Sequence, residues 1–340
     1  MTRTTLKDVA AKAGVSYQTV SKVLNGQMQV TEETETRIWQ TITDLGYRPN
    51  VSARNLRTQA SNLIGHALPG DAAQAYHPIL VQFMISVANA TERLGYHLLS
   101  FGTGTHDFYS HQAYEQLYAR NQVAGFILSN TTQNDPRIPY LIERGIPFCS
   151  FGRANDAWDF CWVDVDGQHG IELATSHLLS QGHQRIGFVT WPEGSQTGWH
   201  REQGYLLALQ AAGIEADPQW IARGDNSAQV GAQGMNQLLA LPAAARPTAV
   251  ICVSDLMAIG AMNAAAAAGL IVGQDIAITG FDDIPMAEYL HTPLTSVRQP
   301  IQEIGRYVID LITKQIRDEP IEQKGVIFKP SLVIRASSQR

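Results

Sequence analysis

The chain has 340 residues, of which 44% are hydrophobic and 16% charged, and its formal net charge is −6. This length and composition indicate a folded protein of two or three domains and exclude a largely disordered chain. No apolar run approaches the roughly 18–20 residues that span a bilayer, and the polar N-terminus lacks the apolar block of a secretion signal. We therefore expect a cytoplasmic protein with no membrane partner.

The charge is unevenly distributed along the chain. Residues 1–61 carry eight Lys and Arg against five Asp and Glu, a net charge of +3, which leaves −9 for the remaining residues. A basic head on an acidic body indicates that the head alone contacts a polyanion.

Capping residues and apolar spacing predict three short helices in the head, over 6–13, from 16 to about 24, and from near 31 to 46. The first two, with Gly14 between them, form a helix-turn-helix pattern, whose second helix enters the major groove of DNA. In that helix Gln18 is suited to adenine, Lys22 to guanine, and Tyr17 offers a ring and a hydroxyl. Small polar side chains nearby suit phosphate contacts, namely Thr5, Ser16, Thr19, Ser21 and Asn25. A plain helical hairpin is the alternative on these residues alone.

The segment Tyr47–Ser61, "YRPNVSARNLRTQAS", has three arginines and no acidic residue. A plain interdomain linker is one interpretation. The other is a hinge helix that becomes ordered on DNA, with Leu56 inserted between base steps of the minor groove and Arg54 and Arg57 near phosphates.

Beyond residue 61, expected strands alternate with amphipathic helices, which predicts parallel sheets covered by helices. The expected strands are Leu63–Leu68, His97–Phe101, Gly125–Ser129, Pro147–Phe151, Trp162–Val165, Ile186–Thr190, Ala249–Ser254 and Ile276–Gly280. The expected helices are Ile79–Leu94, Gly170–Leu179, Gly198–Ala211, Ala228–Leu239 and Leu256–Ala268. The final stretch, "LTSVRQPIQEIGRYVIDLITKQI" followed by "GVIFKPSLVI", predicts a strand, a helix and late strands.

These strands could form one barrel or two doubly wound parallel sheets. Two sheets are favoured because two strands follow each other within Phe151–Asp166 without a helix between them, a natural place to cross between lobes. The expected organisation is a helix-turn-helix domain over 1–46, a hinge over 47–61 and a two-lobed α/β core over 62–340. The first lobe is expected over about 62–162 and 293–322, and the second over about 163–292 and 323–340. A ligand cleft would lie between them.

The run "TLKDVAAKAGVSYQTVSKVLNG", followed by "VTEETETRIWQTITDLGYRPN" and "SARNLR", resembles the lactose/galactose repressor family of bacterial transcription regulators. The resemblance continues through "VDVDGQHGIELATSHLLSQGHQRIGFV", "ICVSDLMAIGAM" and "ITGFDDIPMAEYLHTPLTSVRQP", and so covers essentially the whole chain. It implies a homodimer or a pair of dimers, each dimer binding double-stranded DNA at a near-palindromic operator. It also implies that Tyr17, Gln18 and Lys22 read bases and that Leu56 kinks the centre of the site.

The core resembles the periplasmic sugar-binding fold, which implies a small effector between the lobes. The resemblance implies effector contacts by polar residues of the second lobe near predicted strand ends and helix starts, namely Arg201, Asn226, Asp255 and Asp282. For Asp255 a helix cap is an equal alternative.

In the first lobe, the resemblance implies that the loop "AYHPILVQF" lines the cleft, which makes His77 and Ile79 candidates, and Ser129 ends a strand facing the same side. Gly152 stands where many members of the family carry Asp, which leaves Arg153 as a candidate instead. Trp191 and Trp199 are both able to stack on a sugar, with plain packing the alternative for one of them.

The hypothesis is therefore a ligand-responsive repressor of carbohydrate-use genes; purine-type effectors on the same fold keep the effector class open. The runner-up is a solute-binding protein for sugar transport, which would need a secretion signal and no DNA-binding head. "FGTGTHD" lacks the third glycine of a dinucleotide site, and no nucleophile or phosphate-loop motif occurs, so neither catalysis nor a cofactor is expected. Cys149, Cys161 and Cys252 form no CxxC pair and predict buried thiols, and the histidine spacings predict no metal site.

Overall fold

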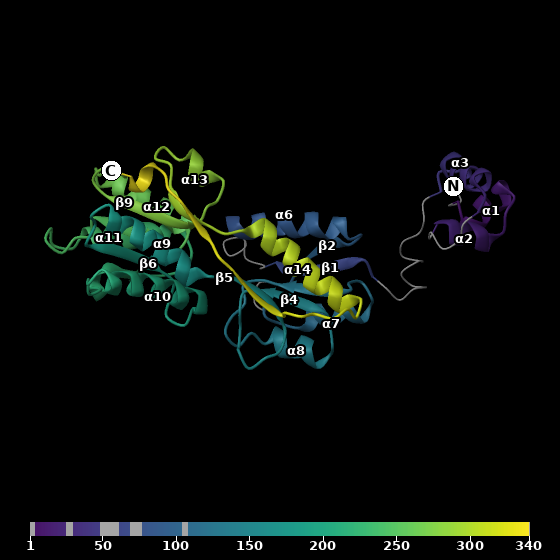
Figure 1. Ribbon diagram of the computed structural model, residues 1–340, viewed down its shortest axis with the longest axis horizontal. Coiled ribbons are helices and arrows are strands. Elements are labelled where there is room, and N and C mark those ends of the chain that lie inside the picture. Colours follow the sequence, from purple (N-terminus) through teal and green to yellow (C-terminus); the bar gives the residue numbers. More distant parts are fainter. Residues whose placement is uncertain (1–3, 25–29, 48–60, 69–76, 104–107, 340) are drawn as a thin grey trace. The chain divides into compact units, whose positions relative to one another are not determined.

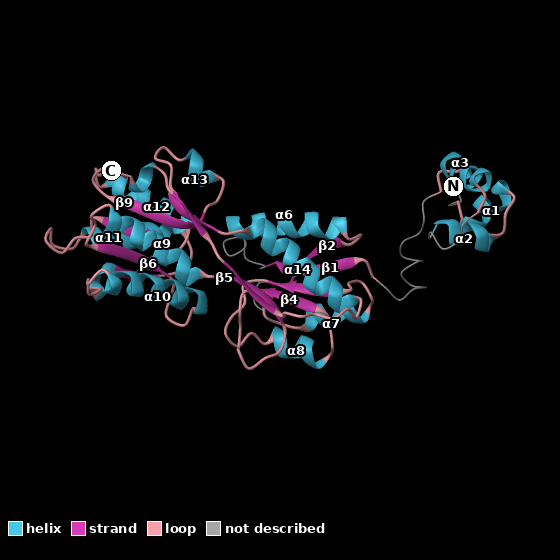
Figure 2. Cartoon of the chain, in the orientation of Figure 1, coloured by secondary structure: helices cyan, strands magenta, loops and turns pink. Residues whose placement is uncertain are grey.

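The computed structural model of the protein describes residues 4–24, 30–47, 61–68, 77–103 and 108–339 (Figures 1 and 2). The chain divides into two compact units, residues 1–61 and residues 62–340, which are considered separately. Across the described ranges, no helix combines the length and apolar character needed to cross a membrane.

The first unit contains three helices in its described part: α1 (Leu6–Ala13), α2 (Tyr17–Leu24) and α3 (Glu32–Asp44). The spacing of apolar residues gives each helix one apolar face, and the three faces pack together in a small core. That core consists of Val9, Ala10, Ala13, Val20, Val23 and Ile38. The predicted order of helices is confirmed. The predicted hinge, apart from its end residues Tyr47 and Ser61, lies outside the described residues.

The first lobe of the second unit is built on a six-stranded sheet with the order β11-β5-β4-β3-β1-β2, and all its strand pairs are parallel. Its strands are β1 (Leu63–Leu68), β2 (His97–Gly102), β3 (Gly125–Leu128), β4 (Phe148–Phe151), β5 (Cys161–Val165) and β11 (Gly325–Phe328). Helices α6 (Pro78–Arg93) and α14 (Ile301–Ile316) pack together on one face, with α7 (Gln112–Ala119) and α8 (Arg137–Glu143) on the other (Figure 1).

The second lobe has a six-stranded sheet in the order β12-β10-β9-β8-β6-β7, parallel except for the β10–β12 pair. Its strands are β6 (Ile186–Thr190), β7 (Ile221–Arg223), β8 (Ala249–Cys252), β9 (Ala277–Asp282), β10 (Thr295–Arg298) and β12 (Ser331–Val333). Its helices are α9 (Gly167–Ser180), α10 (Gln196–Ala211), α11 (Ala228–Leu239), α12 (Asp255–Ala267) and α13 (Met286–Tyr289), with short 3₁₀ turns at Pro218–Trp220 and Ala336–Ser338. α9 packs with α10, and α11 with α12.

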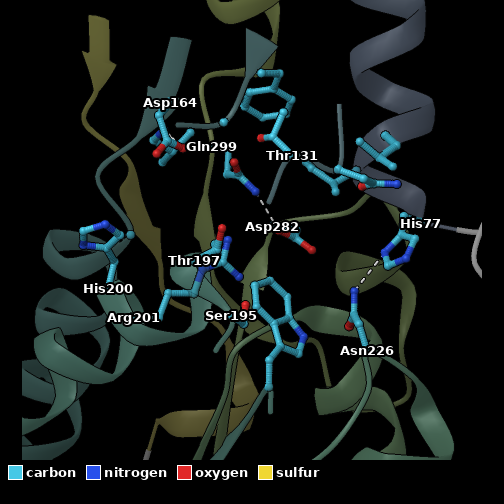
Figure 3. Close-up of a pocket in the computed structure, with 18 of the residues that line it drawn as sticks. His77, Thr131, Asp164, Ser195, Thr197, His200, Arg201, Asn226, Asp282 and Gln299 are labelled. Carbon is cyan, nitrogen blue, oxygen red and sulfur yellow. Dashed lines mark hydrogen bonds between the residues drawn. The ribbon is translucent and has the colours of Figure 1, made fainter. Parts of the chain in front are cut away.

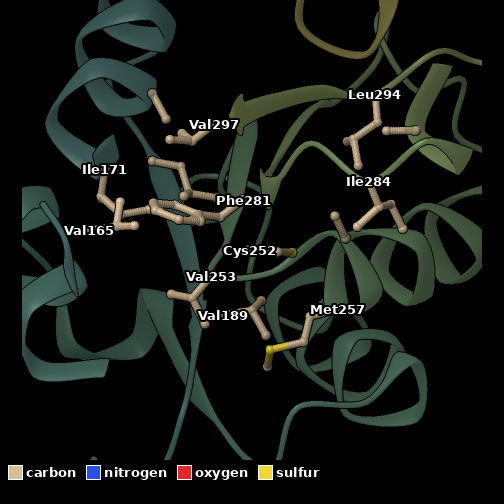
Figure 4. Close-up of a cluster of buried hydrophobic side chains, with 14 of the residues drawn as sticks. Val165, Ile171, Val189, Cys252, Val253, Met257, Phe281, Ile284, Leu294 and Val297 are labelled. Carbon is tan, nitrogen blue, oxygen red and sulfur yellow. The ribbon is translucent and has the colours of Figure 1, made fainter. Parts of the chain in front are cut away.

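The strands of the second lobe are apolar on both faces, as expected for a parallel sheet covered by helices on both sides. β6 and β8 are buried along their whole length. Figure 4 shows part of the resulting core, in which Phe281, Val253 and Met257 lie between the sheet and its helices. The predicted fold class, a helix-turn-helix head and a core of two doubly wound sheets, is confirmed.

The predicted limits of the two lobes are wrong for β5, β10 and β11. The boundary predicted near residue 162 cuts through β5, and β11 is predicted in the second lobe. The two strands pair with each other, and β5 pairs with β4, in the first sheet. β10 is predicted in the first lobe, but it pairs with β9 in the second sheet. The segment after β4 is long enough to return the chain parallel to β4 without a helix. The chain therefore crosses between the lobes after β5, after β10 and after β11.

Helices α11 and α12 approach each other at two glycines. A Cβ on Gly260 would overlap the carbonyl oxygen of Ala228, and one on Gly231 would overlap that of Met257. We expect Gly260→Ala to destabilise the core by about 2 kcal/mol, although Ala is the better helix former by about 1 kcal/mol. Urea unfolding of the core measures this loss. Gly102→Ala, where a Cβ meets nothing within 4 Å, is the control and should shift stability by less than about 0.5 kcal/mol; equal shifts would contradict the packing argument.

Candidate functional site

Helix α2 presents three polar side chains on its outer face. Val20 and Val23 are buried against α1 and α3, so the opposite face is turned outward. Tyr17, Gln18 and Lys22 are exposed on it, with Tyr17 at 45% exposure. Side chains able to donate and accept hydrogen bonds thus stand together on a short helix that the rest of the unit supports, as groove reading requires.

The small hydroxyl residues near α2 also set the ends of the helices. The amide of Thr19 donates to Ser16 Oγ at 3.0 Å, and the Thr5 amide donates to Asp8 Oδ2 at 2.8 Å. These contacts fix the starts of α2 and α1. Thr5 and Ser16 are exposed, whereas Thr19 and Ser21 are partly buried. The remaining predicted DNA contacts, Asn25, Arg54, Leu56 and Arg57, lie outside the described residues.

A cavity of about 340 Å³ lies between the two lobes of the second unit. Its walls come from loops and helix starts that follow the carboxyl ends of parallel strands, where ligands of such sheets bind. Seven predicted effector residues line it: His77, Ile79, Arg153, Trp191, Arg201, Asn226 and Asp282. In Figure 3, Asp164 and His200 lie on one side of this cavity, and His77 and Asn226 on the other.

Arg201 of α10 is the central cation of the cavity and is only 5% exposed. Its guanidinium lies 3.6 Å from the centre of the Phe281 ring and 4.8 Å from that of Trp191, and Nη1 donates to the Val253 carbonyl. Burial lowers the pKa of Arg201 to about 10, against the opposing effect of nearby Asp282. Arg201 Nε is buried and has no hydrogen-bond partner among the described residues, so a donor remains for a ligand.

Asp282, the last residue of β9, is the central anion. Its backbone has a φ of 121°, which is rare for a residue other than glycine and is typical of a functional position. Gln299 Nε2 donates to Asp282 Oδ1 at 2.6 Å (Figure 3). Burial raises the pKa of Asp282 to about 6, while Arg201 and the hydrogen bond from Gln299 act in the opposite direction. A carboxylate and a guanidinium therefore face the same small space.

A hydrogen bond joins the two lobes across one side of the cavity. Asn226 Nδ2, in the loop before α11, lies 2.9 Å from Nδ1 of His77, the residue before α6. Ser254 Oγ donates to Asn226 Oδ1 at 2.5 Å and so orients the amide. Burial lowers the pKa of His77, which keeps the ring neutral. The relative position of the lobes is thus coupled to the residues that line the cavity.

The opposite side of the cavity is held by an ion pair. Arg153 Nε donates to Asp164 Oδ2 at 2.7 Å, and both side chains are about one-fifth exposed. Gly152 has a φ of 116°, and a Cβ there would overlap Thr131 Oγ1. An Asp at this position would therefore need Thr131 to move, whereas Arg153 already lies at the cavity.

Ser129 and Asp255 do not line the cavity, and the expectation for them is corrected. The Ser129 hydroxyl pairs with His66 Nε2 at 2.8 Å in a buried network. Asp255 is fully buried: its carboxylate accepts from Ser296 Oγ at 2.5 Å and from the Ile284 amide at 2.8 Å. It is not the helix cap either, because Ser254 caps α12.

Several lining residues were not predicted from the sequence. They are Leu80, Asn130, Thr131, Phe151, Gly152, Asp164, Val165, Gly167, Pro192, Ser195, Thr197, His200, Asp225 and Gln299. Most adjoin a predicted strand end, and that position was a usable signal. Gln299 had no such signal, because it follows β10, a strand predicted in the first lobe that belongs to the second.

Within the part of the chain that the structure describes, no group of three His, Cys, Asp or Glu side chains could hold a metal ion. The three cysteines are free and buried, as predicted.

Comparisons with known proteins cover both units. The model of bacterial regulatory proteins of the lacI family matches residues 5–50, and that of the periplasmic binding protein-like domain matches residues 175–338. The HTH-type transcriptional repressor CytR of Escherichia coli K12 is 33% identical, over 99% of this chain and 97% of its own length. The repressor PurR of Erwinia tasmaniensis is also 33% identical, over 98% and 96%.

Solved structures match over the whole length as well. The lac repressor dimer bound to operator and an anti-inducer has a TM-score of 0.84 and 28% identity, covering 100% of both chains. The regulator CelR in complex with cellobiose has a TM-score of 0.74 and 31% identity, covering 98% of this chain and 100% of its own. The relatives named here are transcriptional regulators and not enzymes.

Proposed function

Because the chain belongs to the lacI family of bacterial regulatory proteins and is a DNA-binding transcriptional repressor, we propose that a sugar bound between its two lobes controls its affinity for the operator. Its target genes are those of carbohydrate use. The observation that carries the proposal is the presence of both a cation, Arg201, and a carboxylate, Asp282, in the lining of one small, part-apolar cavity.

The chemistry of the cavity suits a polyhydroxylated ligand. Vicinal hydroxyls both donate and accept, so a carboxylate acceptor beside guanidinium donors can bind a pair of them. The buried nitrogens Arg201 Nε and Trp191 Nε1 have no partner among the described residues. Phe151 and Ile79 supply apolar surface for the faces of a sugar ring. The complex of CelR with cellobiose supports this ligand class.

The mechanism follows from the order of the parts along the chain. Two copies of α2, presented by a homodimer, bind two half-sites of a near-palindromic operator through Tyr17, Gln18 and Lys22. The segment 47–61, which includes Leu56, orders on DNA in one arrangement of the lobes. The ligand favours the other arrangement, and a coupling of about 1–3 kcal/mol between the two sites is typical of such switches.

A ligand screen followed by a DNA-binding measurement tests the proposal. A thermal-shift panel of sugars, nucleosides and nucleobases should show stabilisation by a carbohydrate, because a ligand that binds only the folded state raises the melting temperature. The same compound should change the affinity for an operator fragment at fixed salt concentration. A shift produced by a nucleobase alone, with none from any sugar, would contradict the effector class.

We expect effector binding to weaken in mild acid. The ionised Asp282 carboxylate accepts hydrogen bonds on both oxygens, whereas the protonated group loses its charge and turns one oxygen into a donor. Because the pKa of Asp282 is raised to about 6, its ionised fraction falls about tenfold between pH 7 and pH 5, and the affinity should fall with it. Because the folded-state pKa lies above the unfolded one, protonation of this group favours the folded state below pH 6, so the loss is not one of folding. Calorimetry between pH 5 and pH 7 measures the change in effector affinity. Asp282→Asn should bind weakly with a flatter pH dependence; an unchanged slope would assign the effect to another group.

A further inference from the structure

A second depression adjoins the cavity just described. Its volume is about 430 Å³. We call this depression the outer chamber, and we call the cavity between the lobes the inner chamber. The two chambers share three lining residues, Arg153, Ser195 and His200. The outer chamber is completed by Gln133, Asp156, Gly194, Gln196 and Trp199. The two chambers are therefore adjacent, and these three side chains lie at their border.

Trp199 gives the outer chamber a large aromatic surface. It lies in the first turn of α10 and is 57% exposed, and its ring meets that of His200 edge-on, with 5.0 Å between centres. Trp191 is different, because its ring packs against the Arg201 guanidinium in the inner chamber. An exposed tryptophan beside polar groups in a concave site offers its face to an apolar ring surface, and the C–H face of a pyranose is one.

Polar groups continue from the inner chamber into the outer one. Arg153 lines both, and its bond to Asp164 holds the guanidinium in place. Beyond it stand the carboxylate of Asp156 and the amide of Gln133, both exposed. Asp156 and Gln133 belong to the first lobe, whereas Trp199 belongs to the second. Acceptors and donors from one lobe and an aromatic from the other are suited to a hydroxyl-bearing ring between them.

The two lobes also touch here. Gln196 Nε2, at the start of α10, donates to the Ala154 carbonyl at 3.4 Å, which joins the loop after β4 to the second lobe. A ligand in the outer chamber would therefore contact both lobes and contribute to their relative position.

We propose that the effector has at least two sugar units, one in the inner chamber and a second stacked on Trp199 in the outer chamber. This inference rests on the proposed function, because it takes the ligand to be a carbohydrate, and it adds the length of the ligand and the residue that selects it.

Calorimetry on the full chain tests the proposal with pairs of probes. The probes are D-glucose, D-galactose, D-mannose and D-xylose, each with its α-1,4-linked and β-1,4-linked disaccharides. At least one disaccharide should bind at least tenfold more tightly than its monosaccharide. Trp199→Ala should weaken that disaccharide about tenfold and its monosaccharide less than twofold, and Trp199→Phe should restore most of the affinity.

Trp39→Ala is the matched control, because Trp39 is 46% exposed but belongs to the first unit. It should leave both affinities unchanged. If no disaccharide binds more tightly than its monosaccharide, or if Trp199→Ala weakens both equally, the inference is overturned while the proposed function stands. If no carbohydrate of either length binds, the proposed function fails and the inference with it.

Discussion

Arg201→Ala should lower the affinity for the effector at least 100-fold and leave the protein bound to its operator at effector concentrations that release the unchanged protein. Arg201→Ala removes the hydrogen bond that Nε can donate to the ligand, which contributes about 1.5–3 kcal/mol, and also removes the cation beside the buried Asp282 carboxylate, so the two losses together exceed a factor of 100. Arg201→Lys should recover little, because an ammonium cannot reproduce a planar guanidinium packed against Phe281 and Trp191.

Calorimetry for the effector and fluorescence anisotropy for the operator measure the two affinities separately. Arg223→Ala is the matched control: Arg223 pairs with Glu202 on the surface of the same lobe, at 2.7 Å, and does not line the cavity. The affinity of Arg223→Ala for the effector should stay within about twofold of that of the unchanged protein. Equal losses in the two variants, or a loss of operator binding in Arg201→Ala, would mean that Arg201 acts through the fold and not through the ligand.

The local elements were largely predictable because their signals are local. Ala228–Leu239 was placed with correct bounds, since Ser227 caps it and its apolar positions follow a helical period. The sheet to which each strand belongs was not predictable, because strand pairing depends on contacts between residues that are far apart in the sequence. β10 and β11 each have sequences that fit either sheet, and only the contacts of β9 and β5 decide between them.

The same distinction holds at the cavity. The end of a parallel strand predicts that a polar residue lies near the site, and Asp282 was found in this way. It does not predict where the side chain finds its hydrogen bonds. Asp255 and Ser129 stand at equivalent positions, but partners distant in sequence, Ser296 and His66, bind their side chains inside the lobes. Whether a polar residue at a strand end lines the cavity therefore depends on whether its hydrogen-bond partners lie inside the lobe or at the cavity.

In the first unit, the double variant Gln18→Ala with Lys22→Ala should lower specific operator affinity by a factor of about 30 to 10⁴ for each half-site, since each side chain that reads a base contributes about 1–3 kcal/mol. The fold should persist, because both side chains are exposed while Val20 and Val23 form the buried face of α2. Affinity for unrelated DNA should fall much less, since Gln18 carries no charge and Lys22 removes one phosphate-attracting cation at most.

The control for that variant is Lys12→Ala with Gln40→Ala, which deletes the same two residue types from the same unit. Both side chains bind Asp44 on the surface, Lys12 at 3.7 Å and Gln40 at 2.9 Å, and neither lies on α2. Since exposed pairs contribute at most about 1 kcal/mol, stability should change little, and the change in net charge equals that of the α2 variant. Anisotropy titrations on operator and on scrambled DNA at one salt concentration separate the cases. Equal losses of operator affinity in the two double variants would show that α2 attracts DNA only through charge, whereas a large loss confined to the α2 variant assigns base reading to Gln18 and Lys22.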